Sequence, residues 1–145
     1  MDLYTTKRLL FMPTLLATVI MTACTSARPS PSNRGGPIIS GLTASSTSFS
    51  IDCPPTFVTV SAHVIAPVEL RKVQVWYRIG GDQPYAAMDM TALNGRDYGA
   101  TIKGSDLPPG PYGPLQMYVA AADTSGARSQ TVPIATVQFL PCVSH

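Results

Sequence analysis

The three cysteines offer the most specific chemistry in this chain, namely cross-linking, metal binding or covalent modification. Cys24 follows an apolar N-terminal run, whereas Cys53 and Cys142 nearly bracket the rest of the chain. Zinc would need further His or Cys ligands, but His63 has no such neighbour and His145 is the final residue. In an exported protein, the default for such a pair is a disulfide. Closing so long a loop would contribute on the order of 4–5 kcal/mol by restricting the unfolded chain.

The remaining polar residues do not form a grouping that indicates catalysis. His63 lies on the polar side of an alternating segment, where a solvated histidine is the simpler interpretation. The sequence has no Gly-x-Ser-x-Gly elbow, His-Glu-x-x-His helix or phosphate loop. Asp123 begins an Asp-Thr-Ser-Gly turn, and its spacing from Asp82 and Asp106 is not that of a calcium loop. The sequence therefore predicts a protein that is not an enzyme, with no metal and no cofactor.

The N-terminal segment has the composition of a secretory signal. Lys7 and Arg8 precede an apolar run at residues 9–21, which ends in Thr22 and Ala23. A membrane-spanning helix needs about 20 apolar residues, and this run is shorter. We therefore expect export rather than a transmembrane anchor.

The end of this signal resembles the lipobox of bacterial lipoproteins. The tetrapeptide at residues 21–24 reads Met-Thr-Ala-Cys, and it departs from the usual pattern at Met21, where leucine is most common. In that family a signal peptidase cuts before the cysteine, whose sulfur carries a diacylglycerol. The resemblance implies that Cys24 is the lipid-attachment site. An ordinary signal peptide followed by a stray cysteine is the alternative.

Three regions follow from this interpretation. Residues 1–23 are expected to be a cleaved lipoprotein signal peptide and residues 24–36, rich in Ser, Pro, Gly and Arg, a flexible tether. Residues 37–145 are long enough for one folded domain. The resemblance places this domain in the bacterial cell envelope, facing outside the cytoplasm and held to a membrane by lipid.

The charge pattern argues against nucleic acid as a partner. The chain has 10 Lys and Arg against 8 Asp and Glu. The basic residues are scattered along the sequence, without a stripe that could follow a phosphate backbone.

Strict alternation of apolar and polar residues predicts β-strands throughout the domain. In one segment Val58, Val60, Ala62 and Val64 share a face, and in other segments the apolar residues alternate in the same way. Asn94-Gly95 indicates a hairpin, residues 124–129 a turn, and Pro133 an edge or a bulge. About seven strands with regular turn signals predict an all-β antiparallel sandwich. The expected strands are residues 37–45, 56–66, 71–81, 85–90, 97–102, 115–123 and 131–140.

Three motifs resemble the immunoglobulin-like and fibronectin type III-like modules of bacterial surface proteins. The first is V-x-V-x-Y-R, the second Y-x-A-x-I and the third Y-V-x-A-x-D-x-x-G, in that order. The matching residues are Val73, Val75, Tyr77 and Arg78; then Tyr98, Ala100 and Ile102; then Tyr118, Val119, Ala121, Asp123 and Gly126. The resemblance implies an immunoglobulin-like sandwich with Cys53 and Cys142 at one pole. These are core and turn residues, so they carry no information about a ligand.

A group of aromatic and polar residues is the candidate binding face. Alternation directs Trp76, the only tryptophan, outward, and in the resembled fold its strand neighbours the strand of Tyr118. Tyr85 has the same phase, and Arg78 and Gln116 lie beside these rings. Such a face suits binding of an envelope protein or assembly with it. The alternative function is a carbohydrate- or peptidoglycan-binding module. In a further interpretation the rings bind no ligand; they only cover the sheet and pair with each other across strands.

Overall fold

The computed structural model describes residues 35–142 of the chain, and these form ten β-strands and one short 3-10 helix. The strands are β1 (Ile38–Ala44), β2 (Ser48–Phe49), β3 (Phe57–Ile65), β4 (Leu70–Ile79), β5 (Ala86–Asp89), β6 (Thr91–Asn94), β7 (Asp97–Lys103), β8 (Gly113–Asp123), β9 (Arg128–Gln130) and β10 (Ile134–Phe139). The helix η1 (Gly104–Asp106) follows β7. Within this part of the chain no helix has the length and apolarity needed to cross a membrane.

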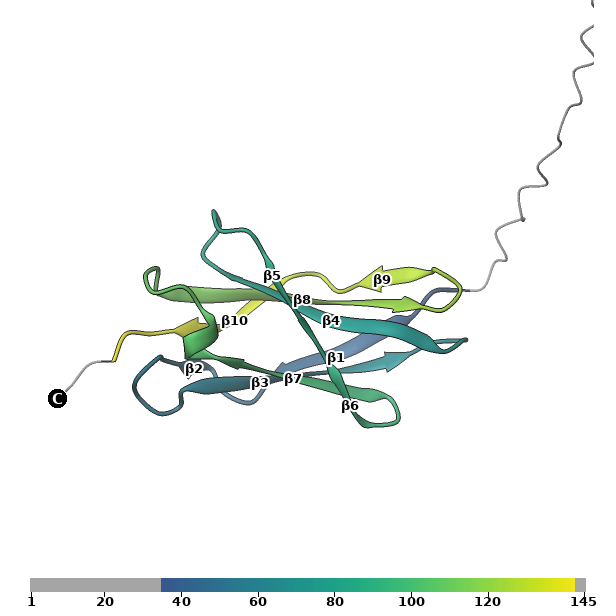
Figure 1. The fold of residues 1–145 in the computed structure, drawn as a ribbon, viewed down its shortest axis with the longest axis horizontal. Helices are drawn as coiled ribbons and strands as arrows, with labels where there is room; N and C mark the ends of the chain where they lie inside the picture. Colours follow the sequence, from purple (N-terminus) through teal and green to yellow (C-terminus); the bar gives the residue numbers. More distant parts are fainter. Residues whose placement is uncertain (1–34, 143–145) are drawn as a thin grey trace, which may run out of the picture. The chain divides into compact units, whose positions relative to one another are not determined.

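The strands form two packed sheets (Figure 1). One sheet has the order β1-β3-β7-β6, and the other has the order β2-β10-β8-β4-β5, with β9 also paired to β8. All pairings are antiparallel except that of β2 with β10. This strand order is that of immunoglobulin-like sandwiches. The predicted all-β, immunoglobulin-like fold is therefore confirmed.

The core lies between the sheets and is built by the alternation seen in the sequence. Strands β3, β4 and β8 each bury every second residue. On β4 this places Val75 and Tyr77 inside, while Gln74 and Arg78 face outward. A shift of one residue would bury the amide and the guanidinium instead, so the hydrophobic pattern specifies the register. The largest fully buried side chains are Phe49, Phe139, Ile102, Leu115 and Met117.

The number of strands is ten rather than about seven, for three local reasons. The pair Ser48–Phe49 adds the short strand β2 beside β10. Residues 86–94 change sheets near the buried Met90, so that β5 pairs with β4 and β6 pairs with β7. The short strand β9 precedes the expected final strand, and β10 begins only after Pro133. Arg128 and Ser129, which we expected in a turn, belong to β9.

The disulfide between Cys53 and Cys142 is present, with a Cα–Cα distance of 5.4 Å. Cys53 lies in the bend between β2 and β3, a few residues before β3 begins. Cys142 follows β10, so the bond ties the end of the last strand to the β2–β3 loop. Cys24, the predicted signal peptide and most of the predicted tether lie outside the described residues.

Candidate binding face

The five predicted face residues lie together on the outer surface of the larger sheet. Trp76 on β4 is directly opposite Tyr118 on β8, and Arg78 is opposite Gln116 in the next outward pair. The Nε of Arg78 donates a hydrogen bond to Oε1 of Gln116 at 2.9 Å. Tyr85 precedes β5, and its ring contacts Tyr118 edge-on, with 5.0 Å between the centroids. The Arg78 guanidinium lies 4.4 Å from the centroid of the Tyr85 ring.

These contacts explain part of the aromatic cluster by folding alone. The rings of Trp76 and Tyr118 are parallel to within 2°, with centroids 6.1 Å apart. Aromatic pairs of this kind contribute about 0.5–1.5 kcal/mol beyond the area they bury. Both rings are half-buried, because each is covered on one side by its neighbours. Cross-strand pairing therefore accounts for a tryptophan on the sheet surface, and a binding role needs a further feature.

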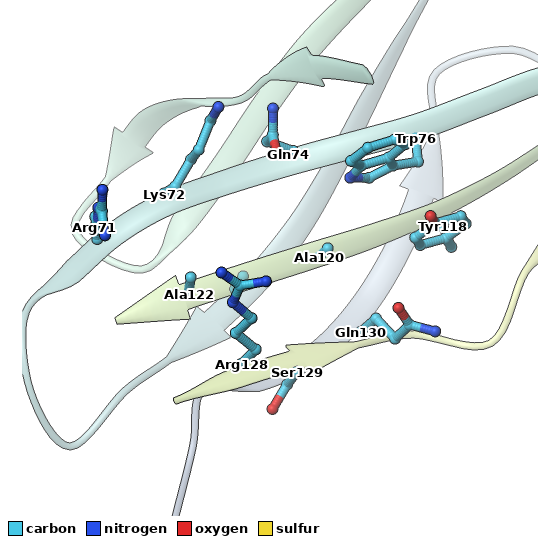
Figure 2. Close-up of a pocket in the computed structure, with 11 residues that line it drawn as sticks. Arg71, Lys72, Gln74, Trp76, Tyr118, Ala120, Ala122, Arg128, Ser129 and Gln130 are labelled. Atoms are coloured by element: carbon cyan, nitrogen blue, oxygen red, sulfur yellow. The ribbon is translucent and has the colours of Figure 1, made fainter. Parts of the chain in front are cut away.

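That feature is a groove of about 600 Å³ that begins at the Trp76–Tyr118 pair and runs along β8 (Figure 2). Its floor is β8, where Ala120 and Ala122 face outward. Longer side chains of β4 and β9 stand on both sides, because β8 lies between these strands. Two cross-strand rows result: Gln74, Ala120 and Gln130, and then Lys72, Ala122 and Arg128. The small alanines between long neighbours are what create the trough.

A β-bulge adds another cation to the end of the groove. Leu70 pairs with Asp123 and Lys72 with Ala122, so Arg71 has no partner residue on β8. An extra residue of this kind re-aims its side chain. Simple alternation from Val73 would turn Arg71 toward the core, yet Arg71 is exposed and lines the groove beside Lys72. Figure 2 shows Arg71, Lys72 and Arg128 toward one end and the aromatic pair toward the other.

The charge of the groove is positive. Its lining includes three basic side chains and no carboxylate. The Nζ of Lys72 lies 3.4 Å from Oδ1 of Asp89, but both side chains are more than half exposed, so this ion pair is weak. The same carboxylate oxygen accepts a hydrogen bond from Nε2 of Gln74 at 2.8 Å. Within residues 35–142, Arg71 and Arg128 form no salt bridge.

Sequence reasoning missed most of this groove. It identified the rings because tryptophan and tyrosine are uncommon, whereas outward Lys, Gln and Arg residues occur on every strand. One signal was present: the outward positions of the segment Tyr118–Asp123 change from tyrosine to alanine. An outward alanine between neighbouring strands with long side chains leaves a depression. Recognising it requires the pairing of β8 with β4 and β9.

Asp123 has a structural role at the β8–β9 hairpin. Its Oδ1 accepts hydrogen bonds from the Ser125 hydroxyl at 2.6 Å and from the backbone N–H of Ser125 at 2.9 Å and of Ala127 at 3.0 Å. The predicted Asx turn is therefore present. These bonds, that of the Ser125 hydroxyl first, lower the pKa of the Asp123 carboxyl, although burial raises it. Its Oδ2 is buried and has no hydrogen-bond partner among residues 35–142. The described residues contain no cluster of three or more side chains suited to hold a metal ion.

His63 has a partner that the sequence did not reveal. Its Nδ1 lies 2.7 Å from Oδ1 of Asp97, which is opposite it on β7. Ser40 is opposite His63 on β1, which places Ser, His and Asp in one row on the smaller sheet. No hydrogen bond joins Ser40 to His63 within residues 35–142, and His63 and Asp97 are over a third exposed. The row therefore lacks the contact between hydroxyl and imidazole that activates a nucleophile.

Comparison with known proteins adds no functional assignment. Neither a protein-family model nor a curated protein matches the chain. Among solved structures, the chain is similar to the crystal structure of a Br derivative of BhCBM56, with 17% sequence identity and a TM-score of 0.39. The similarity covers 57% of this chain and 80% of the other. At this identity and score the similarity shows nothing about ligand or activity.

Proposed function

We propose that this protein is a non-catalytic, lipid-anchored protein of the bacterial cell envelope whose immunoglobulin-like domain binds a glycan in the groove along β8. The groove, with the Trp76–Tyr118 pair at one end and an alanine floor, is the observation that carries the proposal. It is the only feature among those described above that combines apolar rings, amide side chains and space for a ligand.

The groove offers the two kinds of contact that sugars require. A sugar ring has an apolar face of C–H groups that stacks on aromatic rings, and its hydroxyls need hydrogen-bond partners. The stacked pair of Trp76 and Tyr118 lines the start of the groove and offers such an aromatic surface. Gln74 and Gln130 flank Ala120 on either side, and each amide both donates and accepts hydrogen bonds. A glycan chain bound along β8 would therefore contact the aromatic rings at one end of the groove and the amide side chains next to them.

The test should block the groove without unfolding the domain. Ala120→Leu should fill the floor, and Tyr118→Ala should remove one ring while keeping Trp76 as a fluorescent reporter. Tyr112→Ala is the matched control, because Tyr112 is exposed and packs on Phe139, outside the groove.

We expect the unmodified protein and the control to co-sediment with purified peptidoglycan or with an insoluble β-glucan. The two groove variants should lose at least tenfold in affinity, as for removal of a hot-spot aromatic. Glycan addition should also shift the emission of Trp76. Equal binding by all four proteins would refute the groove as the site.

The membrane anchor is a separate part of the proposal. A diacylated Cys24 would supply two acyl chains, which suffices for stable anchoring. In a bacterial host, Cys24→Ser should move the protein from the membrane fraction to the soluble exported fraction. Full retention of the variant in the membrane fraction would contradict lipid attachment at this residue.

Binding or assembly with an envelope protein is the second candidate. It is favoured by the co-occurrence of Trp76, Tyr118 and Arg78, because Trp, Tyr and Arg dominate the binding energy of protein interfaces. The two candidates differ in what Trp76→Ala abolishes. Loss of a protein from pull-downs of native envelope, with glycan sedimentation unchanged, would favour the protein partner.

A further inference from the structure

We infer that the groove along β8 selects a negatively charged oligosaccharide, with its sugar ring on the Trp76–Tyr118 pair and its anionic group at the end formed by Arg71, Lys72 and Arg128. The inference rests on the proposed glycan-binding function and adds the class of glycan. The anionic group is a carboxylate, as in a uronic acid, or a phosphate.

The charge of the groove is complementary to that of an anion. Three basic side chains line one end of the groove, and among residues 35–142 no carboxylate lines it. Asp89 partly neutralises Lys72 through an exposed contact of 3.4 Å, whereas Arg71 and Arg128 have no salt bridge within residues 35–142. Arginine presents a planar fork of donors that matches the two oxygens of a carboxylate or phosphate. Two free forks at one end of a groove therefore favour an anion there.

The backbone departs from regular strand pairing at Arg71, the position that supplies one of the cations. The bulge at Arg71 leaves this residue without a partner on β8 and turns it outward. Arg128 reaches the same end from β9, opposite Ala122. The two strands that flank the floor, β4 and β9, thus each place a guanidinium group at the same end of the groove.

The groove is longer than one sugar ring. Lys72 and Trp76 are four residues apart on β4, which corresponds to about 13 Å at the rise of a strand. One sugar ring cannot contact both ends, so the ligand is an oligosaccharide. Its charge must lie away from the stacked ring.

Single-stranded nucleic acid also combines bases that stack with charged phosphates. It is disfavoured here because its phosphates recur along the whole strand, whereas the basic side chains of the groove lie at one end. Beside the rings, the amides of Gln74 and Gln130 line the groove instead of cations. This class is therefore an outcome of the test rather than the proposal.

The experiment compares matched charged and neutral glycans on the full chain. Isothermal titration calorimetry would measure an oligosaccharide that carries one uronic acid at its end against its methyl ester, and a manno-oligosaccharide that carries one terminal phosphate against its dephosphorylated form. The proteins are the unmodified chain, Arg71→Ala, Arg128→Ala and Tyr118→Ala. The matched control is Arg96→Ala, since Arg96 is exposed in the β6–β7 turn and does not line the groove.

We expect at least one charged glycan to bind tenfold or more tightly than its neutral counterpart, with the preference falling as salt rises. Arg71→Ala and Arg128→Ala should each weaken the charged glycan about tenfold and leave the neutral one unchanged. Tyr118→Ala should weaken both. The charged glycan that binds more tightly than its neutral counterpart identifies the anionic group as a carboxylate or a phosphate.

Three results would overturn the inference, and they differ from one another. Equal affinity for charged and neutral glycans would refute charge selection while leaving glycan binding intact. Tighter binding of oligothymidylate than of every glycan would reassign the groove to nucleic acid. Absence of binding to all four glycans, together with absence of binding to peptidoglycan, would remove the proposed function and this inference with it.

Discussion

Removing the disulfide between Cys53 and Cys142 should cost the domain a large part of its stability. The two residues are 89 positions apart, so the bond closes nearly the whole domain into one loop. The chain-entropy treatment gives about 15 cal/mol/K for a loop of this length, or roughly 4.6 kcal/mol at 25 °C. Small domains have total stabilities of about 5–15 kcal/mol. The domain without the bond should therefore be marginally stable.

The measurement is urea denaturation followed by Trp76 fluorescence. Cys24→Ser serves as the parent, so that its only two cysteines are those of the bond, and Cys53→Ala with Cys142→Ala in that parent removes it. We expect the free energy of unfolding to fall by about 4–5 kcal/mol. The slope of the transition should stay the same or rise, because the open unfolded chain exposes more surface. Stabilities that agree within about 1 kcal/mol would refute the loop-closure reasoning, as would two free thiols in the folded parent.

Three further predictions concern stability. Gly104→Ala should lower the free energy of unfolding by about 1–3 kcal/mol, because its Cβ would collide with the backbone of the β2–β3 loop; Gly81→Ala, with open space around it, should be nearly neutral by calorimetry. Asp123→Asn should lower the melting temperature at pH 7 and flatten its fall in acid. The Asp123 pKa is depressed in the folded state, so its contribution is present above the unfolded value of about 4 and is lost as pH falls through the folded pKa; parallel acid dependence of both proteins from pH 7 to 2 would contradict this. A double-mutant cycle of Trp76→Ala and Tyr118→Ala should give a coupling of about 0.5–1.5 kcal/mol, and zero coupling would mean that the rings do not interact.

The sequence was most informative where one face of a strand is buried. On β3, β4 and β8, alternation predicted both the strands and the inward residues, because a shift of register would bury polar groups. The same alternation predicted that Trp76 faces outward. Its proximity to Tyr118 and Tyr85 followed only with the strand order implied by the resembled fold, and the structure places the three rings in contact.

The remainder depends on pairing between strands, which local patterns do not encode. Arg71 faces the groove because of a mismatch between β4 and β8, and a single strand read alone assigns it to the core side. Residues 128–130 form a strand only because β8 offers a partner, since three residues carry no measurable alternation. The groove itself exists because β8 lies between β4 and β9. Its polar members could not be distinguished from ordinary surface residues in the sequence.

The interruption before Pro133 also determines how this edge of the sheet meets other chains. Among the described strands β9 pairs with β8 alone, and Gly36 lies against Arg128 and Ser129, so the backbone of β9 is only partly open to a further strand. That strand could pair with three residues of β9 only. Beyond them, the N–H of Thr131 is donated to the Val119 carbonyl, and Pro133 has no N–H. A ladder needs more consecutive donors and acceptors than these. The break that leaves β9 as one wall of the groove therefore also limits strand addition at this edge of the sheet.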